Sequence, residues 1–174
     1  MPFPHSMTIH PTTCAGLMQG VDPSTLNAKE VQAILSELED VTLGPHVLPP
    51  NKLSRDMYAN LVLPWASEET SALFDRGTFL RKTWDDNGEL TDGHEFFSGS
   101  SETSLAVMRQ GLGTASMVTR WREAHPEMAG TDRDCVHVAM DKVRRALGAE
   151  SSQESEIMLK MGMGTALLFV TRTT

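Results

Sequence analysis

The sequence predicts a mainly α protein, built as a single helical domain of five or six helices with an extended arm at each end. Apolar residues recur at helical spacing in several segments of residues 27–161, which form the predicted body. Four prolines interrupt residues 1–26, and each removes a backbone donor and disfavours helix at the preceding residue. Residues 162–174 begin with closely spaced glycines and continue in an apolar run, so they form the predicted C-terminal tail.

The first half of the body contains three predicted helices. Asn27 and Glu30 have the spacing of a capping box, and the apolar residues that follow predict a helix over 27–41. A second helix is predicted over 52–62, where leucine and methionine side chains form one stripe and a proline follows shortly. A third, short helix is predicted over 67–76, with a serine at its start and a glycine just after its end.

The middle of the chain has a less regular pattern. Residues 78–97 fit either a strand or a helical turn, and Asn87-Gly88 is the residue pair that a type I′ turn favours. A small β-hairpin near 79–91 is therefore an alternative within the helical protein. A long helical stretch follows Ser101 and runs to about residue 124, although Gly111 and Gly113 weaken it and mark either a break or a close approach to another backbone.

The last part of the body begins with a predicted helix. Thr131 and Asp134 form a second capping-box pattern, an apolar face follows, and Gly148 is placed as the residue that ends the helix. A final short helix is predicted over 153–160. The apolar run 166–170 then fits a strand or an extended arm.

Composition limits the classes of protein that the sequence can represent. The 174 residues are 40% hydrophobic and 22% charged, which is typical of one globular domain with a real core. No secretory leader or run of about 18 apolar residues is found, so no membrane partner is expected. Two cysteines far apart favour a reducing compartment, so the expected location is the cytoplasm or a virion. Eleven methionines suit either a core or an adaptable interface.

Charge is distributed unevenly along the chain. Residues 1–102 carry 15 acidic and 6 basic side chains (−9), and residues 103–174 carry 8 acidic and 9 basic side chains (+1), which together give the net charge of −8.

The arginines of the second half suggest a binding site for nucleic acid. Arginine presents a planar set of donors that suits phosphates, and a nearby aromatic ring can stack on bases. The predicted RNA-binding residues are Arg120, Trp121, Arg122, Arg144 and Arg145.

Two other interpretations of these residues stay open. The arginines can instead pair with the acidic side chains at Asp132, Asp134 and Asp141. Asp134, His137 and Asp141 also share a helix face at a spacing that could present a metal or a proton-transfer pair. No cofactor is expected from any motif, and Cys135 is interpreted as a buried structural thiol rather than a nucleophile.

Two short segments resemble the coat proteins of flexuous filamentous plant viruses. His94-Glu95-Phe96-Phe97-Ser98-Gly99 resembles their Phe-Asp-Phe-Phe-x-Gly segment, and residues 122–128, Arg-Glu-Ala-His-Pro-Glu-Met, are similar to an Arg-Glu-Ala-His-x-x-Met stretch of the potyvirus-type members. The resemblance implies a mainly helical coat subunit that polymerises helically and holds single-stranded RNA in a groove containing arginine.

The sequence-based expectation of function is a non-enzymatic, self-assembling structural subunit, of the kind found in a helical viral coat that packages single-stranded RNA. The expected partners are further copies of the chain, which associate through the terminal arms, and single-stranded RNA. No catalytic signature is present in the sequence. The alternatives are a small metal-binding protein or enzyme that uses Asp134, His137 and Asp141, and an intracellular adaptor that binds a partner protein through a surface rich in methionine.

Overall fold

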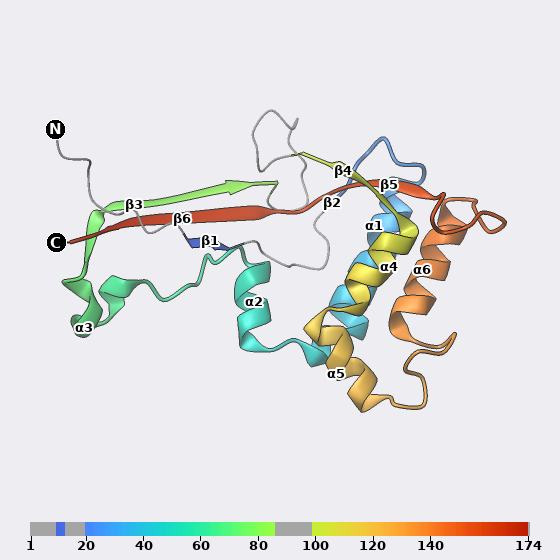
Figure 1. Cartoon of the computed structure of the whole chain (residues 1–174), viewed down its shortest axis with the longest axis horizontal. Helices are drawn as coiled ribbons and strands as arrows, with labels where there is room; N and C mark the ends of the chain where they lie inside the picture. The colour runs from blue at the N-terminus through green and yellow to red at the C-terminus, as the bar shows by residue number, and fades with distance from the viewer. Residues whose placement is uncertain (1–9, 13–19, 86–98, 174) are drawn as a thin grey trace.

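A cluster of helices is joined to two antiparallel sheets, one of which extends far beyond that cluster and has a short helix near its outer end (Figure 1). The structure is a computed structural model, and it describes residues 10–12, 20–85 and 99–173. The helices are α1 (Ala28–Ser36), α2 (Pro49–Arg55), α3 (Glu68–Ser71), α4 (Leu105–Gly113), α5 (Ser116–Ala124) and α6 (Cys135–Ala146), with shorter helical segments η1 (Glu37–Thr42), η2 (Gly44–His46) and η3 (Pro64–Ala66). The strands are β1 (His10–Thr12), β2 (Gly20–Val21), β3 (Phe74–Trp84), β4 (Ser101–Ser104), β5 (Met158–Gly162) and β6 (Thr165–Arg172).

The main core lies between α1, α4, α5 and α6. Val136, Met140 and Val143 of α6 follow helical spacing, and each is at most 2% exposed. Leu105 of α4 and Val118 of α5 are fully buried in the same cluster. The apolar faces predicted from the sequence therefore meet in one core.

A small sheet in the order β2-β5-β4 adds to this core. Thr103 of β4 is paired with Leu159 of β5, and the Leu159 side chain is 1% exposed. The backbone N–H of Leu105, at the start of α4, donates to the carbonyl oxygen of Ile157 at 2.9 Å. The first turn of α4 is thus fixed to the segment that enters β5.

The second sheet, in the order β1-β6-β3, runs outward from the cluster of α1, α4, α5 and α6, and α3 lies near its outer end. Trp84 is paired with Thr165 and Leu80 with Phe169, and the register shifts between Asp75 and Leu80. Met57 and Ala166 form a separate small core against this sheet. Since β5 and β6 are separated by only two residues, one continuous chain segment joins the two sheets.

The prediction of a mainly α fold is wrong, because the chain contains these two antiparallel sheets. Met158–Gly162 is a strand where part of a final short helix was predicted over 153–160. The apolar run 166–170, which fits a strand or an extended arm, lies in strand β6. The stretch after Ser101 begins as strand β4 and continues as two helices, α4 and α5. The predicted hairpin near 79–91 is not seen in its described part, since residues 79–84 lie in β3 and pair with β6; residues 86–91 lie outside the described residues.

The physical reason is that the strands are selected by distant partners. β3 pairs with β6 about 80 to 100 residues later in the chain, at pairs such as Trp84 with Thr165 and Phe74 with Arg172. Such pairing supplies backbone hydrogen bonds and cross-strand contacts that local spacing of apolar residues does not reveal. Short apolar runs fit a helix or a strand equally well until the partner is known.

The helix ends agree only in part with the predicted caps. Asn27 precedes α1 but makes no capping hydrogen bond; its side-chain amide instead donates to the Ala146 carbonyl at 2.7 Å. In the predicted capping box, Thr131 is the cap and Asp134 lies three residues later. In the structure Asp134 is itself the cap of α6, and its side chain accepts a hydrogen bond from the Val136 N–H. Gly148 follows α6 with a φ of +64°, which confirms its predicted place at the helix end.

Among the described residues, no helix is long and apolar enough to cross a membrane.

Candidate functional site

The predicted RNA-binding residues of α5 contact other parts of the chain. Arg120 donates from Nε to the His46 carbonyl at 2.7 Å and from Nη2 to Asn51 Oδ1 at 2.8 Å. Trp121 is 7% exposed, and its ring stacks on His125 with 4.5 Å between ring centres. These contacts fix the orientation of both side chains and leave little of the indole accessible for stacking on a base.

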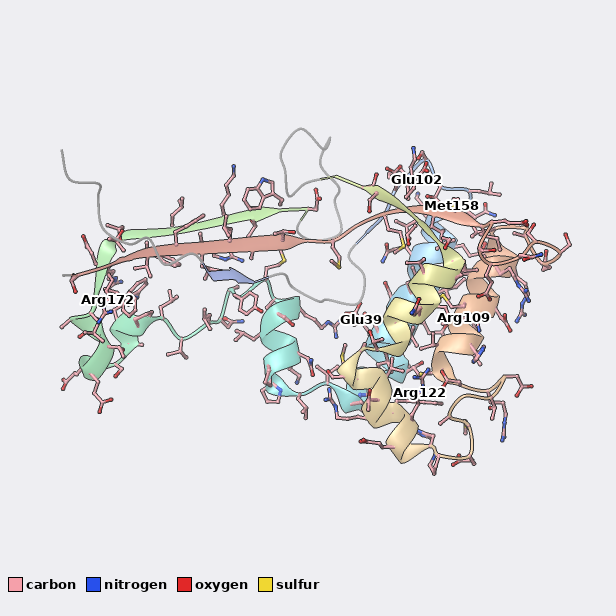
Figure 2. The ribbon with its side chains drawn as sticks, in the orientation of Figure 1. Glu39, Glu102, Arg109, Arg122, Met158 and Arg172 are labelled. Carbon is pink, nitrogen blue, oxygen red and sulfur yellow. The ribbon has the colours of Figure 1, made fainter. Side chains whose placement is uncertain are left out.

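Arg122 forms the centre of a partly buried polar network. Its Nε and Nη2 donate to the two carboxylate oxygens of Asp134, at 2.7 and 3.2 Å, and its Nη1 donates to the Gly113 carbonyl at 3.0 Å. Asp134 is fully buried and also accepts from the backbone N–H groups of Gly130 and Val136. The network therefore joins α5, the end of α4 and the start of α6; Figure 2 labels Arg122 among these helices.

The charge state of this pair follows from its surroundings. Burial opposes ionisation of Asp134, but the hydrogen bonds from Arg122, Gly130 and Val136 outweigh it and lower the pKa of the carboxyl from its ordinary value of 3.8. The hydrogen bond to Asp134 in turn raises the pKa of Arg122. Both groups are thus charged at neutral pH and act as a structural ion pair.

The remaining two arginines lie on α6, away from this network. Arg144 Nη2 is 3.5 Å from Asp141 Oδ1, and the exposed Arg145 donates from Nε to the Asp141 carbonyl at 3.3 Å. Arg109 of α4 also approaches the Asp141 carboxylate, at 3.7 Å. The observed contacts match the interpretation in which arginines pair with Asp134 and Asp141. RNA binding by the five residues stays a sequence-based prediction.

The three residues predicted as a metal or proton-transfer set do not form one ligand group. Both oxygens of Asp134 are occupied by Arg122 and backbone donors, and Asp141 pairs with Arg109 and Arg144. Within residues 10–12, 20–85 and 99–173, no group of three or more His, Cys, Asp and Glu side chains could hold a metal ion. His137 is half-buried on α6.

Cys135 is a buried thiol at the first position of α6. Burial, followed by the negative charge of Asp134, raises the pKa of Cys135 to about 11. The thiolate that a nucleophile or metal ligand needs is therefore scarce at neutral pH. This agrees with its interpretation as a structural residue.

We expect Cys135 to react with iodoacetamide at pH 8 on the order of 100-fold more slowly in the folded chain than in the unfolded chain, because the folded thiol is buried and protonated. The experiment uses a Cys14→Ser background, so that mass spectrometry reports only the second thiol. Equal rates of alkylation in buffer and in 6 M urea would show that Cys135 is accessible and ionised in the folded state.

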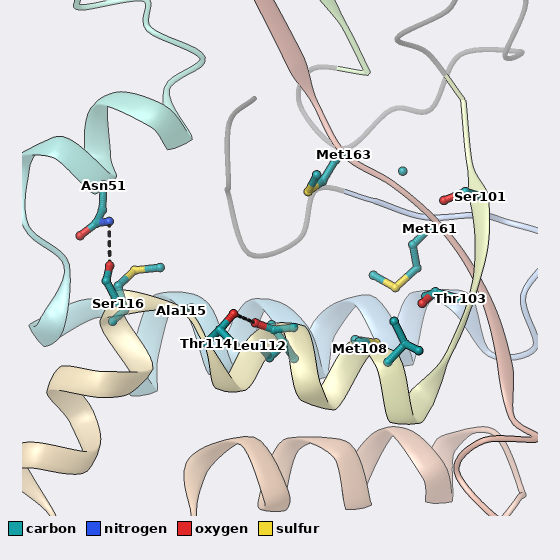
Figure 3. A pocket seen from close by; sticks show the side chains of 14 residues that line it. Asn51, Ser101, Thr103, Met108, Leu112, Thr114, Ala115, Ser116, Met161 and Met163 are labelled. Atoms are coloured by element: carbon teal, nitrogen blue, oxygen red, sulfur yellow. Dashed lines mark hydrogen bonds between the residues drawn. The ribbon is translucent and has the colours of Figure 1, made fainter. Parts of the chain in front are cut away.

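The cavity with the most distinctive chemistry is an open groove of about 570 Å³ beside α4 (Figure 3). One side is formed by β4 and the end of β5, the floor by α4, and the far end by α2 and the start of α5. We call it the methionine groove, because four of its lining residues are methionines. Its lining residues are Asn51, Ser101, Thr103, Val107, Met108, Gly111, Leu112, Thr114, Ala115, Ser116, Met117, Met161, Gly162 and Met163.

None of the described residues that line the methionine groove has a charged side chain. Since 22% of the chain is charged, a set of fourteen residues would contain about three charged ones if the types were drawn at random. The other described cavities differ in this respect. The cavity of about 440 Å³ near Leu26 includes Glu102, Glu156 and Lys160, and that of about 360 Å³ near Asn27 includes Glu30, Lys142 and Arg145.

The polar lining side chains lie in two places: Asn51, Thr114 and Ser116 at the α2 end of the methionine groove, and Ser101 and Thr103 on β4. The Asn51 amide Nδ2 donates to Ser116 Oγ at 3.3 Å, as the dashed line in Figure 3 shows. Thr114 is already engaged, because its hydroxyl donates to the Gly111 carbonyl at 2.7 Å. Asn51 and Ser116 therefore provide the polar groups with remaining hydrogen-bonding capacity at this end.

Sequence reasoning missed this groove, because its residues come from five elements spread between positions 51 and 163. Two local signals were present. Gly111 lies within a predicted helical stretch, where a glycine allows another group to approach the helix backbone closely. Met161 and Met163 are two residues apart, which is the spacing of side chains on one face of a strand. Neither signal identifies the opposite wall.

Comparison with known proteins gives little further information on function. No family model matches the chain, and no curated protein matches it. A solved structure described as a putative type II methyltransferase from Anaeromyxobacter dehalogenans is similar in fold, with a TM-score of 0.48 and 18% sequence identity. The similar region covers 87% of this chain and 47% of that one, so the chain spans about half the length of that protein.

The expected function as a filamentous coat protein is wrong. The resemblance implied a mainly helical subunit, whereas the chain contains two antiparallel sheets. The first resembling segment, residues 94–99, lies outside the described residues except for Gly99. In the second, Arg122 and His125 make the internal contacts described above.

Proposed function

We propose that the chain binds a neutral, mainly apolar small molecule in the methionine groove. The observation that carries this proposal is a groove of about 570 Å³ whose described lining residues are all uncharged, on a chain with a net charge of −8. Small-molecule sites are typically concave, mostly apolar and equipped with a few placed polar groups. A phosphate or other strongly charged ligand would leave its charge uncompensated here, so such ligands are disfavoured.

The methionines suit this role. Met108 and Met117 are buried at the base of the groove, whereas Met161 is half-buried and Met163 is 48% exposed. Methionine has an unbranched, flexible and polarisable side chain, which adapts its shape to apolar partners. Burial of apolar ligand surface against these side chains would supply most of the binding free energy.

Gly111 gives a second line of support. A glycine inside a helix costs about 1 kcal/mol relative to alanine. A Cβ atom added at Gly111 would meet no heavy atom of the described residues within 4 Å, so packing among these residues does not require glycine there. The space above Gly111 belongs to the groove, where a bound molecule could approach the helix backbone.

The test fills this space. We expect Gly111→Phe to weaken binding of the neutral dye Nile red at least about tenfold, because the ring occupies the groove and removes apolar contact area. Binding is measured by fluorescence titration of the full chain.

The matched control is Gln110→Phe, which adds the same ring to the neighbouring, exposed position of α4 outside the groove lining. This variant should bind the dye within about twofold of the unsubstituted chain. Absence of saturable dye binding by the unsubstituted chain, or equal affinity of the Gly111→Phe variant, would contradict the proposal.

A further inference from the structure

We infer that the α2 end of the methionine groove recognises a carbonyl oxygen on the ligand, through the Asn51 amide held in place by Arg120. This inference rests on the proposed function, because it concerns the same groove. It adds the chemical class of the ligand, which is a neutral apolar molecule with a hydrogen-bond acceptor at one end.

The first step of the argument is the orientation of the Asn51 amide. Asn51 Oδ1 lies 2.8 Å from Arg120 Nη2 and 3.2 Å from the backbone nitrogen of Leu48. Arginine nitrogens and backbone N–H groups are donors only, so the atom that faces them must be the amide oxygen. The amide NH2 group is therefore directed toward Ser116 and the groove, as Figure 3 shows.

The second step is the count of donors. The Asn51 NH2 group has two hydrogens, and one of them is directed at Ser116 Oγ at 3.3 Å. Ser116 accepts this bond, so its own hydroxyl hydrogen can be donated elsewhere. The α2 end of the groove thus offers one N–H and one O–H donor side by side. A carbonyl oxygen, which has two lone pairs, can accept both.

The third step concerns Arg120. Its Nε is fixed by the His46 carbonyl at 2.7 Å, and Arg120 is not part of the groove lining. It contacts the oxygen of the Asn51 amide, on the side away from the groove, and would not touch the ligand. Arg120 is therefore a positioning residue: it holds the amide oxygen away from the groove, and the donor side of the amide toward it.

The experiment compares two neutral fluorescent probes of nearly equal size and shape, 2-acetylnaphthalene and 2-isopropylnaphthalene. Only the first has a carbonyl oxygen. The affinities of both are measured for the full chain and for Asn51→Asp, which keeps an acceptor for Arg120 and Leu48 but removes the N–H donor. We expect the substitution to weaken the acetyl probe about fivefold more than the isopropyl probe, as the loss of one neutral hydrogen bond predicts.

Arg120 is tested in the same way. Arg120→Met should also reduce the preference for the acetyl probe, because the amide is no longer held in one orientation, and Arg120→Lys should restore part of it. A residue that only stabilised the fold would weaken both probes equally. Circular dichroism confirms that each variant is folded before its affinities are compared.

The outcomes separate this inference from the proposed function. If neither probe binds the unsubstituted chain, the proposed function fails. If both probes bind but Asn51→Asp changes their affinities equally, the groove is a binding site and carbonyl recognition by Asn51 is refuted. If Asn51→Asp lowers the preference and Arg120→Met does not, the positioning role of Arg120 is refuted.

Discussion

Replacement of Asp134 by alanine is expected to lower the free energy of unfolding by about 3 kcal/mol, since removal of one member of a buried ion pair leaves its partner uncompensated. Asp134 is fully buried and accepts hydrogen bonds from Arg122 and from the backbone N–H groups of Gly130 and Val136. The variant also loses the cap of α6. For a chain of this size the midpoint of thermal unfolding should fall by about 6–12 °C.

The control for this prediction is Arg133→Ala, because the Arg133 side chain is exposed and makes a long contact, 3.4 Å, to the Glu127 carbonyl. Its unfolding free energy should stay within about 0.5 kcal/mol of the unsubstituted chain. A midpoint for Asp134→Ala within 2 °C of that control would show that the network adds little stability.

The same pair predicts how stability depends on pH. Because the folded chain lowers the pKa of Asp134, the unfolded chain binds a proton there more readily. This contribution to stability is fully present above the unfolded pKa of about 3.9 and is lost as the pH falls through the lower, folded value. The difference in unfolding free energy between the unsubstituted chain and Asp134→Asn should therefore shrink below about pH 4.

Replacement of Leu105 by alanine should lower the free energy of unfolding by about 2–5 kcal/mol, since a large buried side chain is removed and a cavity is left. Leu105 is fully buried where α4 meets the small sheet, and its backbone N–H is bonded to the Ile157 carbonyl. The substitution therefore weakens the contact between α4 and β5 as well as the main core. Urea unfolding followed by circular dichroism measures the effect.

The matched control lies on the same helix. Val107 is 59% exposed, so Val107→Ala removes apolar surface that is mostly in contact with solvent. Its unfolding free energy should change by less than about 0.5 kcal/mol. If Leu105→Ala were as stable as this control, the described packing of α4 against the sheet would be incorrect.

The helical body illustrates what can be predicted from sequence. The buried face of α6, with Val136, Met140 and Val143, and the end of that helix at Gly148 follow from local spacing and from the conformational freedom of glycine. The interpretation of Cys135 as a buried thiol follows from its position beside the same face. In each case the deciding interactions are within a few residues of one another.

The candidate site could not be predicted in the same way. Asn51 and Ser116 are 65 residues apart, and both contribute to one end of the methionine groove. Arginines chosen as RNA ligands from their clustering in sequence are divided between different partners: Arg120 contacts Asn51, and Arg122 contacts Asp134. Donor groups in a sequence become ligands or structural contacts according to the acceptors that the fold brings near them.

The sequence alone determined α1, α6 with its buried apolar face, and the presence of an unusual number of methionines, because helical spacing and composition are local properties. Only the tertiary structure decided that β3 pairs with β6 and that Met108 and Met161 line the same groove. Strand pairing and cavities depend on contacts between segments far apart in the chain, whose energies local patterns do not record.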